Sequence, residues 1–147
     1  MNILKEYQIQ PVKGVNNFPS TKISSAEDSY EVIKQFWKED IEIYESFFIL
    51  LLNRANKTIG WAKISQGGIT GTVVDIKIVM KYVIDSLASA VIVAHNHPSG
   101  NLVPSQSDLD ITDKLKKSLK LMDTNLVDHL ILSPNGDFYS FLNNGDL

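Results

Sequence analysis

Residues 90–100 read Ala-Val-Ile-Val-Ala-His-Asn-His-Pro-Ser-Gly, an apolar run that leads into two histidines and a turn. The first five residues predict a short central strand with apolar residues on both faces. The proline and the glycine end that strand and start a loop. In extended backbone, residues i and i+2 point to the same side. The side chains of His95 and His97 are therefore expected to reach one point just past the strand end.

The flanking segments predict one α/β domain with a mixed sheet. Apolar residues at helical spacing predict helices over about residues 26–38, 76–88 and 105–122. Apolar or alternating runs predict strands over residues 45–52, 58–65, 127–132 and 138–141, with a further extended segment at 69–74. Residues 1–25 show no sustained period and are expected to form an irregular lead-in to a domain over residues 26–147.

The composition excludes several classes of protein. The 147 residues include no cysteine, which removes disulfides, iron–sulfur clusters, thiol nucleophiles and Cys-based zinc sites. A net charge of −3 gives no general attraction to nucleic acid. No run approaches the ~18 apolar residues of a membrane span, and residues 1–6 lack the apolar core of a signal peptide. These features predict a cytoplasmic protein with no membrane partner.

A metal site is the main chemical hypothesis. Imidazole is a good ligand for zinc, so His95 and His97 need a third ligand that is not cysteine. Asp108, in the first turn of the helix that begins near Ser105, is the natural candidate. Two histidines and one carboxylate leave a position for water, as in catalytic zinc sites, where the pKa of the water falls to about 7. The same donor set also binds Fe(II), so iron remains an alternative.

A bound water also needs a base to take its proton. Glu45 begins an apolar strand, where a carboxylate is costly unless it has a task, and is the candidate; Glu39 and Glu42 are alternatives. Ser105 can donate a hydrogen bond to the oxyanion of a tetrahedral intermediate. Each of these residues can also have a purely structural role. Ser105 and Asp108 also fit a helix capping box, and Glu45 can be an exposed strand end.

Taken together, these residues resemble a known motif. His95-x-His97, seven residues, Ser105, two residues and Asp108, with Glu45 upstream, resemble the JAMM (MPN+) metalloprotease motif. More narrowly, residues 94–100, with Pro104 and Thr112 beyond them, resemble the bacterial RadC family, and residues 128–132 and 140–145 resemble the end of that domain.

The resemblance implies a cytidine-deaminase-like, three-layer α/β/α fold. It implies one zinc per chain, bound by His95, His97 and Asp108, with Glu45 as the acid/base and Ser105 as the oxyanion donor. The implied activity is zinc-dependent hydrolysis of a peptide or isopeptide bond in a peptide or protein substrate. The alternative is a DNA-repair or mobile-element accessory protein that binds DNA or a protein partner without proteolysis, and a non-catalytic interaction module is a third reading.

The sequence departs from the RadC pattern in two places. Residues 75–78 read Asp-Ile-Lys-Ile where the family usually has His-Pro-Arg-Glu, which leaves substrate choice open. Longer RadC proteins carry an N-terminal helix-hairpin-helix region, for which the chain is expected to have no room. The lysines at 114, 116, 117 and 120 are interpreted as a solvated helix face, with weak nucleic-acid contact as the alternative. His129 is interpreted as a hydrogen-bonded core residue, with orientation of a ligand or of Glu45 as the alternative.

Overall fold

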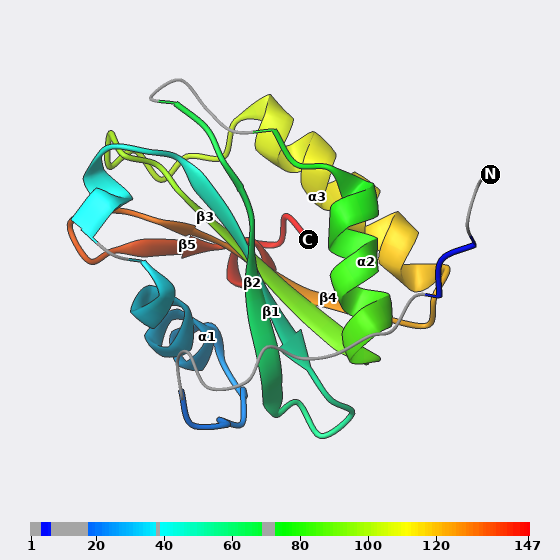
Figure 1. Ribbon diagram of the computed structural model, residues 1–147. Helices are drawn as coiled ribbons and strands as arrows, with labels where there is room; N and C mark the ends of the chain where they lie inside the picture. Colours follow the sequence, from blue (N-terminus) through cyan, green and yellow to red (C-terminus); the bar gives the residue numbers. More distant parts are fainter. Residues whose placement is uncertain (1–3, 7–17, 38, 69–72) are drawn as a thin grey trace.

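The strands of the computed structural model form one sheet in the spatial order β2-β1-β3-β4-β5 (Figure 1). The structure describes residues 4–6, 18–37, 39–68 and 73–147. β3 and β4 run parallel, whereas the other neighbouring pairs are antiparallel, so the predicted mixed sheet is confirmed. The strands are β1 (Ser46–Leu52), β2 (Thr58–Gln66), β3 (Ala90–Asn96), β4 (Asn125–Leu132) and β5 (Phe138–Ser140).

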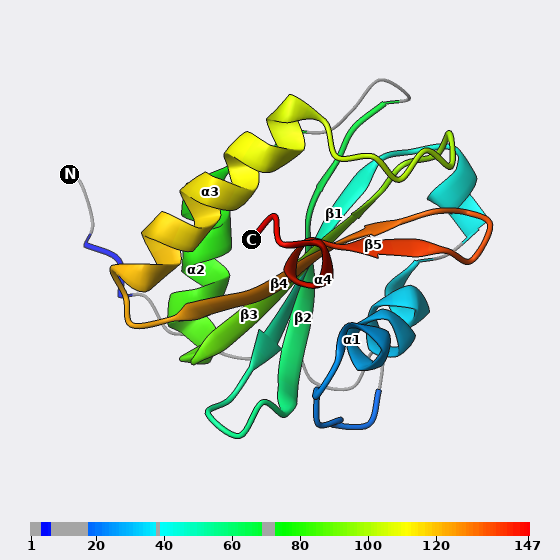
Figure 2. The ribbon, with the colours of Figure 1, turned by 180° about the vertical axis from the view of Figure 1, so that it is seen from behind.

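Helices cover both faces of the sheet. Figures 1 and 2 show α1 on one face and α2 and α3 on the other, which confirms the three-layer arrangement. The helices are α1 (Ala26–Ile33), α2 (Ile76–Ser86), α3 (Gln106–Lys120) and α4 (Phe141–Asn144), with 3-10 turns η1 (Lys34–Phe36) and η2 (Glu39–Glu42). None of the described helices is long and apolar enough to cross a membrane.

Two hydrophobic cores lie on the two faces of the sheet. Because side chains alternate along a strand, even-numbered residues of β1 and β3 pack toward α1 and odd-numbered residues pack toward α2 and α3. The first core includes Ile33, Phe48, Leu50, Ile92, Ala94 and Leu130. The second includes Phe47, Ile49, Val79, Val83, Val93, Leu115 and Leu119. This alternation directs positions 95 and 97 toward α3 and position 96 toward the α1 side.

The structure corrects several predicted boundaries. β3 continues through Asn96, so His95 lies in the strand and not in the following loop. The first helix ends at Ile33, followed by η1 and then by extended backbone at Trp37. The last strand ends at Ser140, whose side chain caps α4, a helix that the sequence reasoning missed. Of the predicted extended segment at 69–74, residues 69–72 lie outside the described residues.

The described end of the predicted lead-in packs against the domain. Ile23 is 6% exposed and belongs to the core on the α1 side. Lys22 forms an isolated β-bridge with Lys57 in the turn between β1 and β2. Residues 1–3 and 7–17 lie outside the described residues, so the boundary at residue 25 stays a prediction.

Candidate metal centre

Strand register brings Glu45 and the histidines together. In the antiparallel pair of β1 and β3, Phe47 lies opposite His95. Continuing that register by two residues places Glu45, immediately before β1, opposite His97, on the face that holds α3. The main-chain oxygen of Glu45 also accepts a hydrogen bond from Gly67, which fixes the start of β1 against the end of β2.

Asp108 reaches the same point from the first turn of α3. Its position is set by a capping box: Ser105 Oγ accepts from the Asp108 amide at 3.1 Å, and Asp108 Oδ2 accepts from the Ser105 amide at 2.8 Å. The capping interpretation of this pair is therefore confirmed. It does not exclude a ligand role, because a carboxylate has two oxygens and several lone pairs, so the cap leaves acceptor capacity free.

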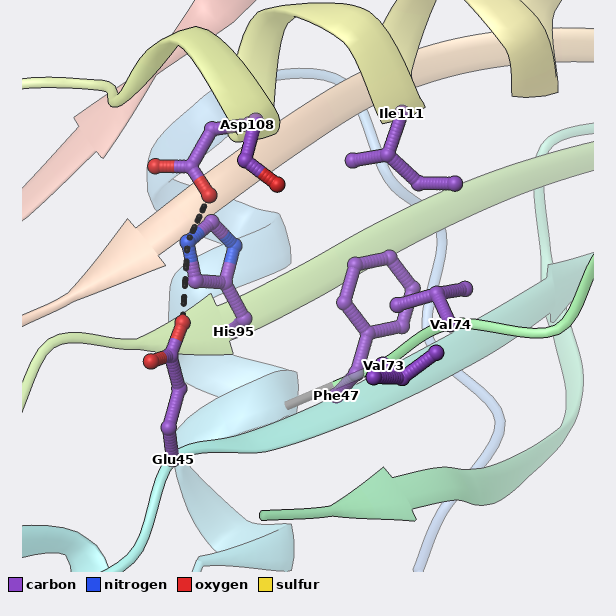
Figure 3. Close-up of a pocket in the computed structure, with 8 residues that line it drawn as sticks. Glu45, Phe47, Val73, Val74, His95, Asp108 and Ile111 are labelled. Atoms are coloured by element: carbon purple, nitrogen blue, oxygen red, sulfur yellow. Dashed lines mark ion pairs between the residues drawn. The ribbon is translucent and has the colours of Figure 1, made fainter. Parts of the chain in front are cut away.

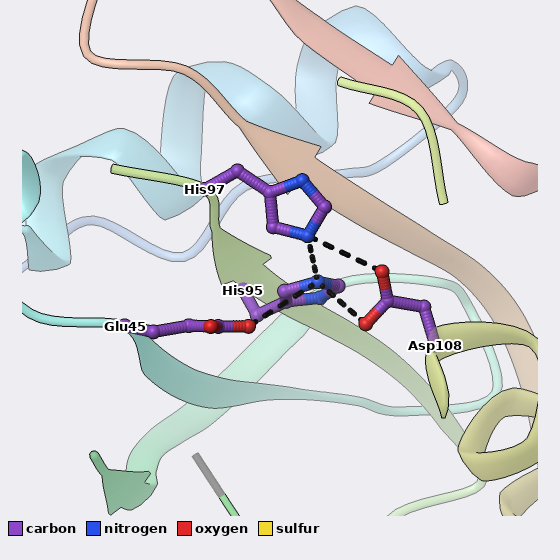
Figure 4. A group of neighbouring side chains, drawn as sticks. All are labelled: Glu45, His95, His97 and Asp108. Carbon is purple, nitrogen blue, oxygen red and sulfur yellow. Dashed lines mark hydrogen bonds and ion pairs between the residues drawn. The ribbon is translucent and has the colours of Figure 1, made fainter. Parts of the chain in front are cut away.

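The four side chains converge closely (Figure 4). One ligand atom from each of Glu45, His95, His97 and Asp108 lies within 4.8 Å of the others. The two carboxylate oxygens of Asp108 lie 3.1 Å from His95 Nε2 and 3.2 Å from His97 Nε2. The two histidine Nε2 atoms are 3.0 Å apart, and Glu45 Oε1 is 3.9 Å from His95 Nε2.

The chemistry of these donors fits a metal ion. Each histidine turns Nε2 toward the cluster while its Nδ1 atom is engaged elsewhere: His97 Nδ1 contacts the carbonyl oxygen of Asn101 at 2.5 Å, and His95 Nδ1 contacts His129. Imidazole ligands in metal sites use their second nitrogen in this way. Two nitrogens and a carboxylate beside a second acid suit zinc with an open position.

Charge stabilisation within the cluster favours ionised Asp108. Burial alone would raise the pKa of this carboxyl, but its contacts with the imidazoles of His95 and His97 outweigh that effect and hold the pKa well below its usual range. The hydrogen bond to Asp108 raises the pKa of His97, although partial burial acts in the opposite direction. The contact between the His97 imidazole and the Asp108 carboxylate contributes to both shifts.

These shifts predict that stabilisation by zinc increases with pH. The raised pKa of His97 stabilises the metal-free fold below the ordinary value of 6.5, and this contribution is lost as pH rises through the folded-state pKa. Zinc must displace the same proton, so its binding strengthens over that interval. We expect the zinc-induced rise in Tm to be larger at about pH 8 than at about pH 6. An equal rise at both values would contradict proton–metal competition at this cluster.

Asn96 is a buried residue whose contribution the sequence reasoning missed. It is 0% exposed, and its side chain points to the α1 side of the sheet. Asn96 Oδ1 accepts from the Ser46 amide at 2.8 Å, and Nδ2 donates to the carbonyl oxygens of Ile41 and Tyr44 at 2.7 and 2.8 Å. These bonds hold the segment that carries Glu45. The sequence feature that could have indicated this role is a polar residue between two histidines at the end of an apolar strand.

The remaining candidates fall outside the cluster. Glu42 is exposed in η2. Ser105 is exposed at the N-cap of α3, one helical turn from Asp108. The side chain of Asp75 caps α2 by accepting from the Lys77 amide at 2.8 Å, so the segment that departs from the RadC pattern begins this helix.

The lysine group on α3 is exposed, as predicted for a solvated face. Lys117 forms an ion pair with Asp113 at 2.7 Å, one turn away on the same helix. The other members of the group are Lys114, Lys116 and Lys120.

A cavity of about 240 Å³ opens beside the cluster (Figure 3). Glu45, His95 and Asp108 line one part of it. Its apolar lining consists of Phe47, Val73, Val74 and Ile111. Phe47 is 1% exposed and Val73 is 87% exposed, so the apolar surface extends from the sheet out to solvent.

The fold and the site together define a class of protein: an α/β domain with a candidate metal centre at the carboxyl end of β3. The family model of the RadC-like JAB domain matches residues 23–146. The chain therefore belongs to the RadC-like JAB domain family, as the resemblance implied.

Curated relatives of the chain include several UPF0758 proteins. One from Flavobacterium johnsoniae is 40% identical over 124 residues, covering 84% of this chain and 53% of the relative. One from Porphyromonas gingivalis is 40% identical over 101 residues, covering 69% and 44%. UPF0758 protein YfjY from Escherichia coli is 42% identical over 101 residues, covering 69% and 62%. The chain thus spans about half the length of the first of these relatives, and their names state no activity.

Proposed function

We propose that this domain is a zinc-dependent hydrolase that cleaves a peptide or isopeptide bond. The observation that carries the proposal is the convergence of two imidazoles and two carboxylates within 4.8 Å at the edge of a cavity. The family assignment supports metal-dependent hydrolysis as the class of chemistry. Zinc is the proposed metal because three nitrogen and oxygen ligands with room for a water are typical of catalytic zinc, which acts as a Lewis acid in hydrolysis. Iron binds the same donor set, and metal analysis of the purified protein separates the two.

The two carboxylates are suited to different tasks. Asp108 contacts both histidines and is held ionised, as a ligand with His95 and His97 requires. Glu45 lies farther out, at 3.9 Å from His95 Nε2, and lines the cavity. Its proposed role is to accept a proton from an attacking water and to return it to the leaving amine. A bound zinc ion would polarise the amide carbonyl and lower the pKa of a water molecule.

Ser105 is the proposed donor to the oxyanion. In the capping box its Oγ acts as an acceptor from the Asp108 amide, so its hydroxyl proton is free to be donated. A hydroxyl anchored at a helix N-cap is positioned before substrate arrives, which is what stabilisation of developing charge requires.

The cavity favours substrates with an apolar side chain next to the scissile bond. Ile111→Asp is expected to lower kcat/KM for a peptide with leucine at that position by about 10-fold or more, because a carboxylate replaces apolar contact. Ile111→Val is the matched control and should have a much smaller effect. Equal losses on leucine and glutamate substrates would show that the cavity does not hold this side chain.

The proposed activity is tested with the purified full chain loaded with zinc. Metal analysis should give about one zinc per chain, and a peptide-library screen should show cleavage that a chelator abolishes. Glu45→Gln serves as the inactive control. Absence of zinc affinity in the wild-type protein would reject the proposal.

The accessory role in DNA repair or in a mobile element stays a separate prediction. A gel-shift titration over salt tests it, because binding through phosphates weakens steeply as salt rises. No shift at low salt would reject direct DNA binding.

A further inference from the structure

A continuous chain of hydrogen bonds runs behind the candidate metal centre. His95 Nδ1 lies 2.7 Å from His129 Nε2, and His129 Nδ1 lies 2.6 Å from Thr112 Oγ1. Thr112 Oγ1 donates to the main-chain oxygen of Asp108 at 2.6 Å. The chain starts at one proposed ligand on β3, crosses β4, and ends on the main chain of another proposed ligand on α3.

The bond from Thr112 to the main-chain oxygen of Asp108 fixes the donor and the acceptor in the other two bonds. A carbonyl oxygen can only accept, so the single hydroxyl proton of Thr112 points at Asp108. Thr112 Oγ1 is then an acceptor toward His129, and the proton between them belongs to His129 Nδ1. This fixes one of the two ring nitrogens of His129 as a donor.

The other ring nitrogen of His129 must be an acceptor. His129 is 0% exposed, and its ring stacks on Phe141 with centroids 4.4 Å apart and meets the edge of Phe47 at 5.7 Å. A charged imidazolium between aromatic rings would lose its hydration, so the ring carries one proton. Nε2 of His129 therefore accepts from His95 Nδ1–H, which leaves the lone pair of His95 on Nε2, facing the cluster.

We propose that His129 and Thr112 are positioning residues that select the tautomer of His95 required to bind the metal. The inference rests on the proposed metal centre. His97 needs no such relay, because a main-chain carbonyl oxygen already receives its Nδ1–H. His95 lies within β3, where its Nδ1 faces another side chain. A neutral histidine there must present an acceptor, and Thr112 ensures that it does.

Zinc affinity of matched variants tests the relay without any assay of hydrolysis. His129→Phe keeps an aromatic ring against Phe141 but removes the acceptor, and should weaken zinc binding by about 10–100-fold. His129→Gln retains an oxygen that can accept from His95 and should recover most of the affinity. Competition with a chelating dye measures both. Wild-type affinity in His129→Phe would show a packing role alone and overturn the proposal.

A second pair keeps the test decisive if the first variant misfolds. Thr112→Val preserves shape but removes the hydroxyl, whereas Thr112→Ser retains it. Zinc affinity should fall in Thr112→Val and be close to wild type in Thr112→Ser. Melting of the metal-free variants separates loss of the fold from loss of the ligand. Equal affinities for the valine and serine variants would overturn the role of Thr112.

Ring-nitrogen NMR reads the tautomer directly. In the metal-free and zinc-loaded wild-type protein, we expect neutral His129 with its proton on Nδ1. A proton on Nε2 of His129 would overturn the inference. Since the metal-free measurement needs neither zinc binding nor substrate, failure of the relay is distinguishable from failure of the proposed hydrolase activity.

Discussion

Glu45→Gln is expected to lower the rate of amide hydrolysis by about 10²–10⁴-fold, the usual contribution of a general acid–base group. The variant keeps the shape of the side chain but removes its ability to accept a proton. Zinc affinity should change little, because Glu45 lies farther from the histidines than Asp108 does. The measurement is kcat on a cleaved peptide, alongside zinc content.

Glu42→Gln is the matched control for this prediction. Glu42 is an exposed acid three residues upstream, outside the cluster, so its loss should leave hydrolysis unchanged. An active Glu45→Gln variant with full zinc occupancy would remove Glu45 from the reaction. Loss of activity in Glu42→Gln with retention in Glu45→Gln would transfer the role to the upstream acid.

His97→Ala is expected to weaken zinc binding by more than about 100-fold and to remove hydrolysis with it. Loss of a hydrogen bond behind a ligand already costs about 10–100-fold, and loss of the ligand itself costs more. His97 has 16% of its side chain exposed, so the fold should tolerate alanine better here than at buried His95. Zinc titration and melting of the metal-free protein measure the two effects separately.

Lys116→Ala, at an exposed position on α3, is the control for His97→Ala and should bind zinc as the wild type does. Full zinc affinity in His97→Ala would show that the metal, if bound, uses other ligands. A metal-free His97→Ala protein that fails to fold would be replaced by His97→Gln, which retains side-chain length and hydrogen bonding.

The local part of the site could be predicted from sequence. The spacing of His95 and His97 follows from alternation along a strand, and the pairing of Ser105 with Asp108 follows from helix capping. Both depend on residues close together in the chain. The same holds for the central strand, although its end was misplaced because two polar residues at the end of an apolar run resemble the start of a loop.

The contacts between residues far apart in the chain could not be predicted from the sequence. The contact between His95 and His129 joins residues 34 apart in the chain and depends on the parallel register of β3 and β4. The bond from the Ser46 amide to Asn96 joins residues 50 apart and depends on the antiparallel register of β1 and β3. The pattern of residues along one chain does not determine either register, so the partners of these buried polar groups follow only from the three-dimensional structure.

The tripeptide His95-Asn96-His97 has a consequence for how the domain tolerates insertions and deletions. Its two histidines face α3, while the asparagine between them faces the other side and holds the segment before β1. A shift of β3 by one residue would exchange the two faces. Asn96 would then point at the carboxylates, and the histidines would enter the opposite core. Gaining or losing a single residue in β3 should thus be far more damaging than a change of length in the turn after β1, since it would disrupt metal binding and placement of the base together.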